Sequence, residues 1–395
     1  MVHPHAKPSA AIGEVTDLLA PLIALRHDLH AHPELGYAEH RTAALVAREL
    51  LALGLDVTTG IGGTGVVGTL RHGGSARRIA LRADMDALPI TEDTGLPYAS
   101  RTAGIFHGCG HDGHTTMLLG AARHLARTRR FDGTVVFVFQ PAEEGRAGAR
   151  AMIADGLFER FPADEIYALH NWPDLPVGQA RTRPGPIMAA ADRFDIRVEG
   201  RGGHAAQPHN TPDAVLAASQ LVAQLNTIVA RRISPSASAV LSVTRIEGGS
   251  SHNVLPALVQ LTGTVRSFDA AVQDRIEQSV RQVAAGVALA SETRIDVAYD
   301  RYYPATINDP AAADRALAAA ALVCEQAAMA DAPSFASEDF AFMLRAKPGA
   351  YLWLGQARGT GDAPLHHPAY DFNDAIIGRG IAWYTALVEA RLSAS

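Results

Sequence analysis

The sequence predicts an α/β protein in which a smaller α+β domain interrupts a larger domain. The chain has 395 residues, well above the common domain length of about 150, so more than one domain is expected. In the first part of the chain, short apolar runs alternate with helical segments, which is typical of an α/β layer architecture. The middle of the chain instead follows the order β-α-β-β-α-β, the ferredoxin-like pattern.

The first part, residues 1–187, alternates predicted helices and strands. Helices are expected over 15–30, 41–53, 114–128 and 147–155, strands over 79–82, 134–140 and 165–169, and a glycine-rich hairpin over 60–72. Because strands joined by helical crossovers run parallel, the alternation predicts a largely parallel sheet. Ligands of such sheets bind beyond the carboxyl ends of the strands.

The pattern changes over residues 188–302, which we expect to form the inserted domain. Strands are predicted over 193–199, 239–246, 258–267 and 294–298, and helices over 211–231 and 270–290. From residue 303 to 395 the pattern of the first part resumes. There the alanine-rich stretch Ala311–Ala330 is expected to be one amphipathic helix, and a last helix is expected over 374–392.

Composition excludes several classes of protein. Hydrophobic residues make up 48% of the chain, so it can bury large cores and is not expected to be disordered. The 35 Lys and Arg against 41 Asp and Glu give a net charge of −6, and without a basic block nucleic-acid binding has no electrostatic basis. Two cysteines cannot build a disulfide scaffold, and no segment resembles an export signal or a bilayer span. We therefore expect a cytoplasmic protein that binds neither nucleic acid nor membranes.

Several of the 17 histidines stand beside other metal-binding side chains. Cys109 and His111 lie two residues apart in the glycine-flanked run His107–His114, so a thiolate and an imidazole can reach one point. Further donors follow at Glu143–Glu144, His170 and His366–His367. Asp84 and Asp86 are candidates to hold a ligating histidine in one tautomer. Together these residues offer more than four donor atoms, which favours a two-metal site over a single structural zinc.

Each of these residues also has a simpler explanation. Cys109 could be a small buried hydrophobic residue, and a single histidine at a strand end is more often structural than a ligand. Glu143 and Glu144 could begin a helix, where the dipole favours negative charge. If they instead continue a strand, they point to opposite sides, so one could bind metal while the other handles a proton. A Cys–His–Asp nucleophile built on Cys109 is a further alternative, but it leaves both glutamates and His366 without a role.

Five motifs together resemble the peptidase M20 family of metallo-amidohydrolases. They are His27–Gly36, Cys109–His114, Pro141–Gly145, Gly202–His209 and Gly263–Phe268. The match is to the branch of hippurate hydrolases, aminoacylases and auxin-conjugate hydrolases, and it runs from about Ile23 to the end of the chain. Gly108 and Ala147 stand where alanine and glycine are usual in the family, but neither position supplies a donor atom. The resemblance implies a zinc-peptidase-like catalytic domain with a central mixed sheet.

The resemblance also implies a metal centre with a role for each ligand. Two divalent ions would share Cys109, with His111 and His170 completing one site and Glu144 and His366 the other. Glu143 would be the general base. His366 fits the family's Leu-His-x-Pro pattern, which makes His367 a bystander. The thiolate and imidazoles favour zinc, while the carboxylate leaves manganese, cobalt and nickel open.

The inserted domain is implied to be a lid and dimerisation domain. His204 would donate to the oxyanion, in the family often from the partner subunit of a homodimer. Asn253 and Arg266 would bind the free carboxylate of the substrate, to which a guanidinium donates two parallel hydrogen bonds. Hinges of the lid are expected near Ala189 and Tyr302.

The activity that follows is hydrolysis of the amide of an N-acyl amino acid of the N-benzoyl or N-acetyl type. The products would be a carboxylic acid and a free amino acid. A dipeptidase or carboxypeptidase on the same scaffold is one alternative. A non-catalytic metal- or ligand-binding homologue is another, although a pure binder does not need a base such as Glu143 beside the metal.

Overall fold

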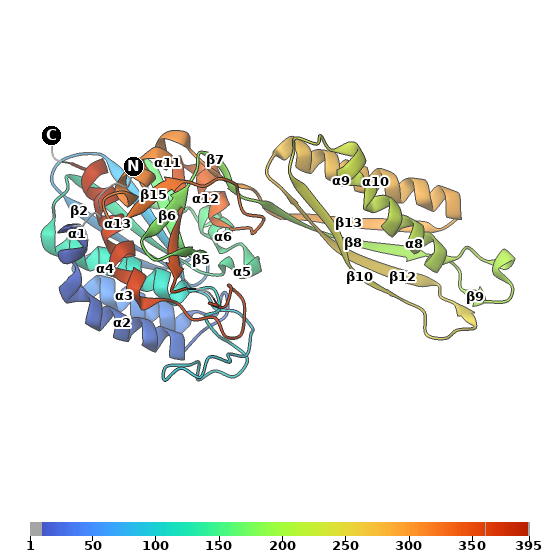
Figure 1. Ribbon diagram of the computed structural model, residues 1–395, viewed down its shortest axis with the longest axis horizontal. Helices are drawn as coiled ribbons and strands as arrows, with labels where there is room; N and C mark the ends of the chain where they lie inside the picture. Colours follow the sequence, from blue (N-terminus) through green and yellow to red (C-terminus); the bar gives the residue numbers. More distant parts are fainter. Residues whose placement is uncertain (1–9, 360, 394–395) are drawn as a thin grey trace. The chain divides into compact units, whose positions relative to one another are not determined.

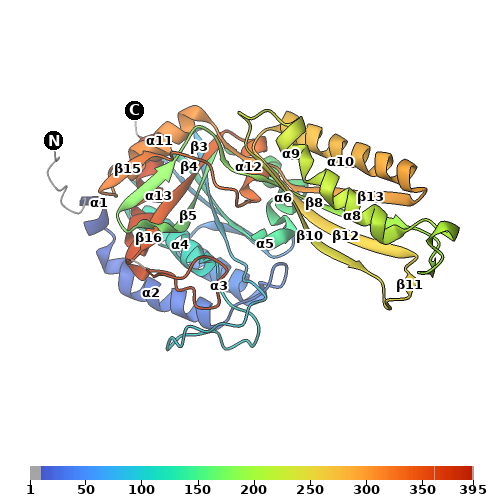
Figure 2. The same cartoon turned by 45° about the vertical axis from the view of Figure 1, so that its right-hand side comes forward.

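The computed structural model describes residues 10–359 and 361–393 and divides the chain into two compact units (Figures 1 and 2). The first unit comprises Met1–Ile187, Thr306–Ala332 and Asp339–Ser395, and the second comprises Met188–Ala305 and Pro333–Glu338. The predicted insertion, residues 188–302, falls within the second unit. No pattern in the sequence predicts that the segment Pro333–Glu338 belongs to the second unit. It belongs there because Ala189 donates its backbone N–H to the carbonyl oxygens of Ser334 and Ala336, at 3.1 and 2.9 Å.

The first unit is built on an eight-stranded mixed sheet with the order β1-β2-β4-β3-β5-β16-β6-β15. Its strands are β1 (Asp56–Ile61), β2 (Gly65–His72), β3 (Arg78–Asp84), β4 (Gly133–Gln140), β5 (Glu165–Pro176), β6 (Gln179–Thr182), β15 (Gln326–Met329) and β16 (Gly349–Ala357). Strands β4, β3, β5 and β16 run parallel, whereas β1, β2 and β4 pair antiparallel, as do β16 and β6. Because β15 also pairs in parallel with β6 at one edge, parallel and antiparallel pairs are mixed, and the expectation of a largely parallel sheet holds only in part.

Helices cover this sheet and bury its apolar side chains. The longer ones are α2 (Thr16–Ala31), α3 (His40–Ala52), α4 (His111–Thr128), α11 (Pro310–Ala320) and α13 (Ile377–Arg391). The shorter ones are α1 (Ala10–Gly13), α5 (Glu143–Arg146), α6 (Gly148–Ala154), α7 (Leu157–Arg160), α12 (Phe340–Ala346) and the 3-10 turn η2 (Asp374–Ile376). Outside the large sheet, strand β7 (Gly185–Met188) pairs with strand β14 (Thr306–Asn308). Leu118 of α4 and Trp383 of α13 join Phe137 and Leu169 of the sheet in one buried cluster. Among the described residues, no helix is long and apolar enough to cross a membrane.

The alanine-rich stretch of the first unit is not one helix, which corrects the prediction for Ala311–Ala330. Asp309 caps α11 by accepting from the N–H of Ala312 at 2.8 Å, and the helix ends at Ala320. After a turn, β15 pairs in parallel with β6, and the N–H of Gln326 donates to the carbonyl of Gly178 at 3.0 Å. Hydrogen bonds to a strand that is distant in sequence therefore outweigh the helix propensity of alanine. Cys324 lies buried in the turn rather than in a helix.

The second unit has the element order β-α-β-β-α-β that the sequence predicts. Its antiparallel sheet has the order β10-β12-β8-β13, with β8 (Ala190–Glu199), β10 (Ala239–Gly248), β12 (Leu258–Ser267) and β13 (Arg294–Tyr303). Helices α8 (Ala214–Leu225), α9 (Thr227–Arg232) and α10 (Ala270–Ser291) lie over one face of it (Figure 1). The predicted helix over 211–231 is therefore two helices that meet at Asn226. The side-chain amide of Asn226 donates a hydrogen bond to the carbonyl of Val222 at 2.8 Å. A ribbon of β9 (Gly203–His204) and β11 (Val254–Leu255) and the 3-10 turn η1 (Pro208–Asn210) complete the unit.

Candidate metal centre

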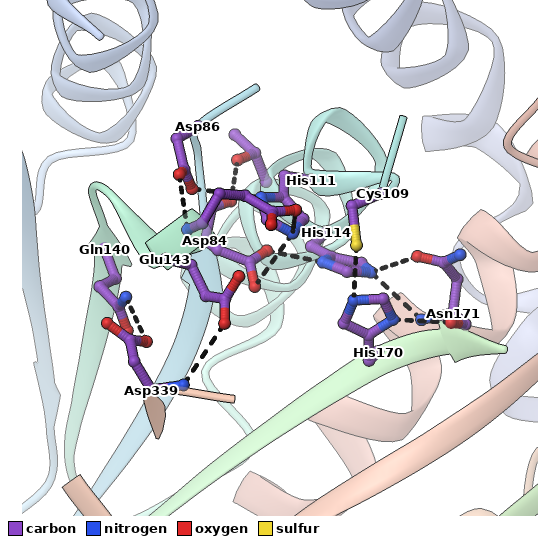
Figure 3. A network of polar contacts seen from close by, with 12 residues as sticks. Asp84, Asp86, Cys109, His111, His114, Gln140, Glu143, His170, Asn171 and Asp339 are labelled. Atoms are coloured by element: carbon purple, nitrogen blue, oxygen red, sulfur yellow. Dashed lines mark hydrogen bonds and ion pairs between the residues drawn. The ribbon is translucent and has the colours of Figure 1, made fainter. Parts of the chain in front are cut away.

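Side chains from four parts of the first unit meet beyond the carboxyl ends of β3 and β4 and at the middle of the longer strand β5 (Figure 3). Asp84 ends β3, Glu143 follows β4, and His170 lies in β5. Cys109 precedes α4, and His111 is the first residue of that helix. The edge of a parallel sheet where the strands end is where ligands of such folds bind.

Among the described residues, the structure brings metal-binding atoms together in five groups, and two of these groups include Cys109. Cys109, His111 and His170 form one group, and Cys109, Glu144 and His366 form the other, with the ligand atoms of each group within 4.8 Å of one another. The Cys109 Sγ lies 3.4 Å from the His170 Nε2. The His366 Nε2 lies 3.3 Å from a Glu144 carboxylate oxygen. The sequence analysis assigns the same five residues to the same two sets, and their role as metal ligands stays a prediction.

Two glycines allow the loop before α4 to aim its donors. Gly110 has φ +90°, which side chains rarely adopt, and a Cβ there would lie 2.5 Å from the Asn171 Oδ1. At Gly113 a Cβ would lie 2.2 Å from the Phe372 ring. The Cys-Gly-His-Asp-Gly pattern therefore needs glycine at both places for this geometry to form.

His366 reaches the cluster through an unusual backbone conformation. Its φ is +64°, and its N–H donates to the carbonyl of Gly108 at 2.8 Å, which ties it to the loop that carries Cys109. Its neighbour His367 uses Nδ1 to accept a hydrogen bond from the N–H of Ala369 at 3.1 Å. Of the two histidines, His366 is thus the one that the structure brings to the other donors.

Hydrogen bonds orient the histidines so that their Nε2 atoms face the cluster. The His111 Nδ1 lies 3.2 Å from one oxygen of Asp86, and the other oxygen of Asp86 accepts from the N–H of Glu144 at 2.9 Å. The His170 Nδ1 donates to the carbonyl of Asn171 at 2.7 Å. A carboxylate or carbonyl that takes the far ring N–H of a histidine fixes the tautomer that binds metal. Asp86 is therefore placed to orient two candidate ligands at once.

The charges around the cluster fit divalent cations. The His111 Nε2 and a Glu144 carboxylate oxygen are buried and have no hydrogen-bond partner among the described residues. Burial lowers the pKa of His111, but Asp84, Asp86 and Glu144 outweigh it and raise the pKa to about 10. Burial, and then Glu144 and Glu143, raise the pKa of the Cys109 thiol well above its usual range. Cations at this point would neutralise the carboxylates and contact both of these atoms.

Of the two alternatives for Glu143 and Glu144, the structure has the helix start and not the continued strand. Strand β4 ends at Gln140, and both glutamates lie in the single turn α5. Glu144 leaves the helical region with φ −68° and ψ 81°, so the backbone changes direction at this residue. Glu143 is 7% exposed, and a carboxylate oxygen of its side chain lies within 4.8 Å of the ligand atoms of His111 and Glu144.

His114, which has no predicted role, lies one helical turn after His111. Its Nδ1 lies 2.6 Å from a carboxylate oxygen of Asp84, and its Nε2 accepts from the N–H of Asn171 at 3.1 Å. The Asn171 side-chain amide in turn donates to the Tyr370 hydroxyl at 2.7 Å. The (i, i+3) spacing of His111 and His114 was the available signal that both face the same side of α4.

A second buried network holds the start of α4. The Asp112 carboxylate accepts from Arg26 at 3.0 Å and from the His30 Nδ1 at 2.8 Å. The other His30 ring nitrogen lies 3.3 Å from Glu92. Burial lowers the pKa of His30, but Asp112 and Glu92 outweigh it and raise the pKa to about 9. Because Asp112 is next to His111 in the chain, this network fixes the N-terminal end of α4, which carries the candidate metal ligand His111.

The stability that His30 contributes is expected to depend on pH. Its folded-state pKa is raised, so the stabilisation is complete below about pH 6.5 and is lost as the pH rises through about 9. Urea unfolding of the metal-free protein and of His30→Phe should therefore show a stability difference that shrinks by about 3 kcal/mol between these pH values. A difference that stays constant over this range would show that His30 is not charged in the folded protein.

The three predicted residues of the inserted domain lie in the second unit. His204 and Asn253 are neighbours on the ribbon of β9 and β11, where the N–H of Ala205 donates to the carbonyl of Asn253 at 3.0 Å. Arg266 lies at the opposite end of β12, since Leu258 pairs with Glu199 and Arg266 with Ala191. Eight residues of strand span about 26 Å. Asn253 and Arg266 therefore lie at different ends of the unit within one chain, and their predicted role in binding the substrate carboxylate stays a prediction.

Comparison with known proteins places the chain in a family. The sequence model of peptidase family M20/M25/M40 matches residues 80–390. The chain is 40% identical over 381 residues to a hippurate hydrolase of Campylobacter jejuni, covering 95% of this chain and 98% of that protein. It is 42% identical over 357 residues to an N-acetyl-L-cysteine deacetylase of Bacillus subtilis, covering 90% of this chain and 84% of that protein.

A solved structure supports the same family assignment. A Bacillus subtilis protein described as a dinuclear metal binding peptidase from the M20 family superposes with a TM-score of 0.83 at 34% identity, covering 95% of this chain and 99% of that one. The resemblance seen in the motifs is thereby confirmed, and so is the α/β fold with its large mixed sheet. The chain belongs to peptidase family M20/M25/M40 and is an enzyme that acts on amides.

Proposed function

We propose that this enzyme hydrolyses the amide of N-acyl amino acids with two divalent metal ions. Cys109, His111 and His170 would hold one ion, and Cys109, Glu144 and His366 the other. The observation that carries the proposal is that two groups of donor atoms share Cys109 and lie beside a buried carboxylate, Glu143. A thiolate and three imidazoles with one carboxylate favour zinc, although manganese, cobalt or nickel could also serve.

When bound, the two ions would polarise the scissile carbonyl and lower the pKa of water. Glu143 is placed to accept the proton of the attacking water and to deliver it to the leaving amine nitrogen. Its side chain is suited to this because it is nearly excluded from solvent and lies beside the ligands His111 and Glu144. Asp86 would keep His111 and Glu144 in place while the proton moves.

The second unit would supply further binding groups in a homodimer. Helix α8 and the edge strand β10 expose apolar side chains, among them Leu216 and Ile246, which suits them to a subunit interface. His204 and Asn253 lie together at one end of the sheet and Arg266 at the other. We propose that His204 donates to the oxyanion and that Arg266 binds the substrate carboxylate. In a homodimer, the two ends of the sheet would serve different active sites. The assembly and the cytoplasmic location stay predictions.

N-benzoylglycine and N-acetyl amino acids are the substrates we propose. The names of two relatives support this, since one is a hippurate hydrolase and another an N-acetyl-L-cysteine deacetylase. A carboxypeptidase activity is the alternative, because a protein named thermostable carboxypeptidase 1 from Saccharolobus solfataricus is 36% identical over 339 residues.

A substrate panel decides between these activities. The zinc-loaded enzyme is expected to hydrolyse N-benzoylglycine and N-acetylmethionine with a kcat/KM at least about 100-fold above that for glycylmethionine, because a free amine would enter the site charged and unpaired. Release of the amino acid is measured with each substrate and again with zinc replaced by manganese or cobalt. Preference for the free-amine dipeptide or for longer peptides would exclude the N-acyl amino acid assignment.

A further inference from the structure

Asp339 is fixed at the candidate metal centre by three hydrogen bonds to its carboxylate. One oxygen accepts from the Gln140 amide at 2.7 Å and from the Arg82 guanidinium at 3.2 Å, and the other accepts from the N–H of Ala149 at 2.9 Å. Asp339, Arg82, Gln140 and Ala149 are all fully buried. A carboxylate held by this many donors in a dry environment has little freedom to move.

The backbone of the same residue contacts the candidate base. The N–H of Asp339 donates to a carboxylate oxygen of Glu143 at 3.4 Å (Figure 3). Because the side chain of Asp339 is anchored, its N–H cannot turn away from Glu143 without breaking those bonds. We propose that Asp339 is a positioning residue that holds Glu143 in place for amide hydrolysis. This inference rests on the proposed role of Glu143 as the base.

Helix capping, the usual role of an aspartate at the start of a helix, does not explain the contacts of Asp339. Asp339 is the N-cap residue of α12, yet its side chain makes no capping hydrogen bond to that helix. Asp213, Asp269 and Asp309, which cap α8, α10 and α11, all accept from N–H groups of their own helices. Asp339 instead directs its carboxylate to side chains of β3 and β4 and to the backbone of α6. An N-cap bond stabilises a helix by about 1 kcal/mol, so its replacement by other contacts indicates a different role.

Arg82 links this anchor to the metal-ligand side of the centre. Its guanidinium also donates to Asp84 at 2.7 Å and to the Gln140 side-chain oxygen at 2.8 Å. Asp84 in turn lies 3.8 Å from the Nε2 of the candidate ligand His111. One buried cation therefore joins the carboxylate that faces His111 to the residue that contacts Glu143, and the base and the ligand are held relative to one another.

The variant Asp339→Asn tests this role. It keeps the shape of the side chain and the backbone N–H but removes the charge that holds Arg82. We expect kcat for N-benzoylglycine to fall about 10- to 100-fold, as for a catalytic group displaced by up to 1 Å, while KM stays within about twofold and two metal ions remain bound. Gln140→Met, which removes a neutral donor to Asp339, should lower kcat by a smaller factor, again with little change in KM and with two metal ions bound.

Glu165→Gln is the matched control, because Glu165 is buried and ion-paired at the other end of β5, about 16 Å from His170. It should leave kcat unchanged.

A double-mutant cycle with Glu143→Gln separates positioning from a purely structural effect. If Asp339 acts through Glu143, adding Asp339→Asn to Glu143→Gln should lower the remaining activity less than twofold. The same 10- to 100-fold loss in both backgrounds, or an unchanged kcat in Asp339→Asn and in Gln140→Met, would overturn the inference. An active Glu143→Gln enzyme, or a wild-type enzyme without amide hydrolysis, would instead overturn the proposed function itself.

Discussion

Replacing Glu143 with glutamine is expected to abolish nearly all amide hydrolysis while the protein keeps its metal. The amide has the size of the carboxylate but cannot accept the proton of the attacking water, so kcat should fall about 10²- to 10⁴-fold. Glu143 belongs to neither group of donors that shares Cys109, so metal binding should not change. Initial rates with N-benzoylglycine and elemental analysis of the same sample measure both quantities.

Two results would contradict this role. Turnover within about threefold of the wild type would exclude Glu143 as the base, because removing a general base costs far more. Loss of metal in parallel with activity would instead make Glu143 a ligand. An unfolding temperature close to that of the wild type is needed to exclude misfolding, and the nearly complete burial of the side chain makes that control necessary.

The second large effect is expected at Cys109, which both candidate metal groups share. In Cys109→Ser a hydroxyl that stays protonated replaces the thiolate, so both ions lose a ligand at once. Losing a hydrogen-bond partner of a metal ligand weakens metal binding about 10- to 100-fold, and losing a shared ligand should weaken it more than that. Elemental analysis after dialysis should find fewer than one ion per chain.

The chain contains its own control for this variant. Cys324 is buried to the same extent as Cys109, with 8% of each residue exposed, but it belongs to neither group of donor atoms. Cys324→Ser should therefore bind two ions and keep full activity. Two ions retained by Cys109→Ser would exclude Cys109 as a bridging ligand.

The sequence indicates the metal centre well where its residues are close in the chain or follow directly on a predicted strand. Cys109 and His111 are two residues apart, and Glu144 and His170 belong to segments whose place in a parallel sheet follows from the alternation of strands and helices. The choice of His366 over His367 depends on the family resemblance, since no local pattern predicts a backbone with φ +64° at His366.

What the sequence does not show are the contacts between residues far apart in the chain. Arg82 and Asp339 are 257 residues apart, and no pattern around either predicts their bond. The strand pairing that ends helix α11 early and the separation of Asn253 from Arg266 likewise depend on the register between strands. Register is set by burial and hydrogen bonding across the whole sheet, which a local pattern does not contain.

Titration of the metal-free enzyme with zinc tests the central claim most directly. We expect hydrolysis of N-benzoylglycine to be absent without metal, and zinc bound per chain, measured by elemental analysis, to reach two at maximal activity. Full activity in the metal-free protein, or maximal activity with a single bound ion per chain, would contradict a centre in which two ions share Cys109.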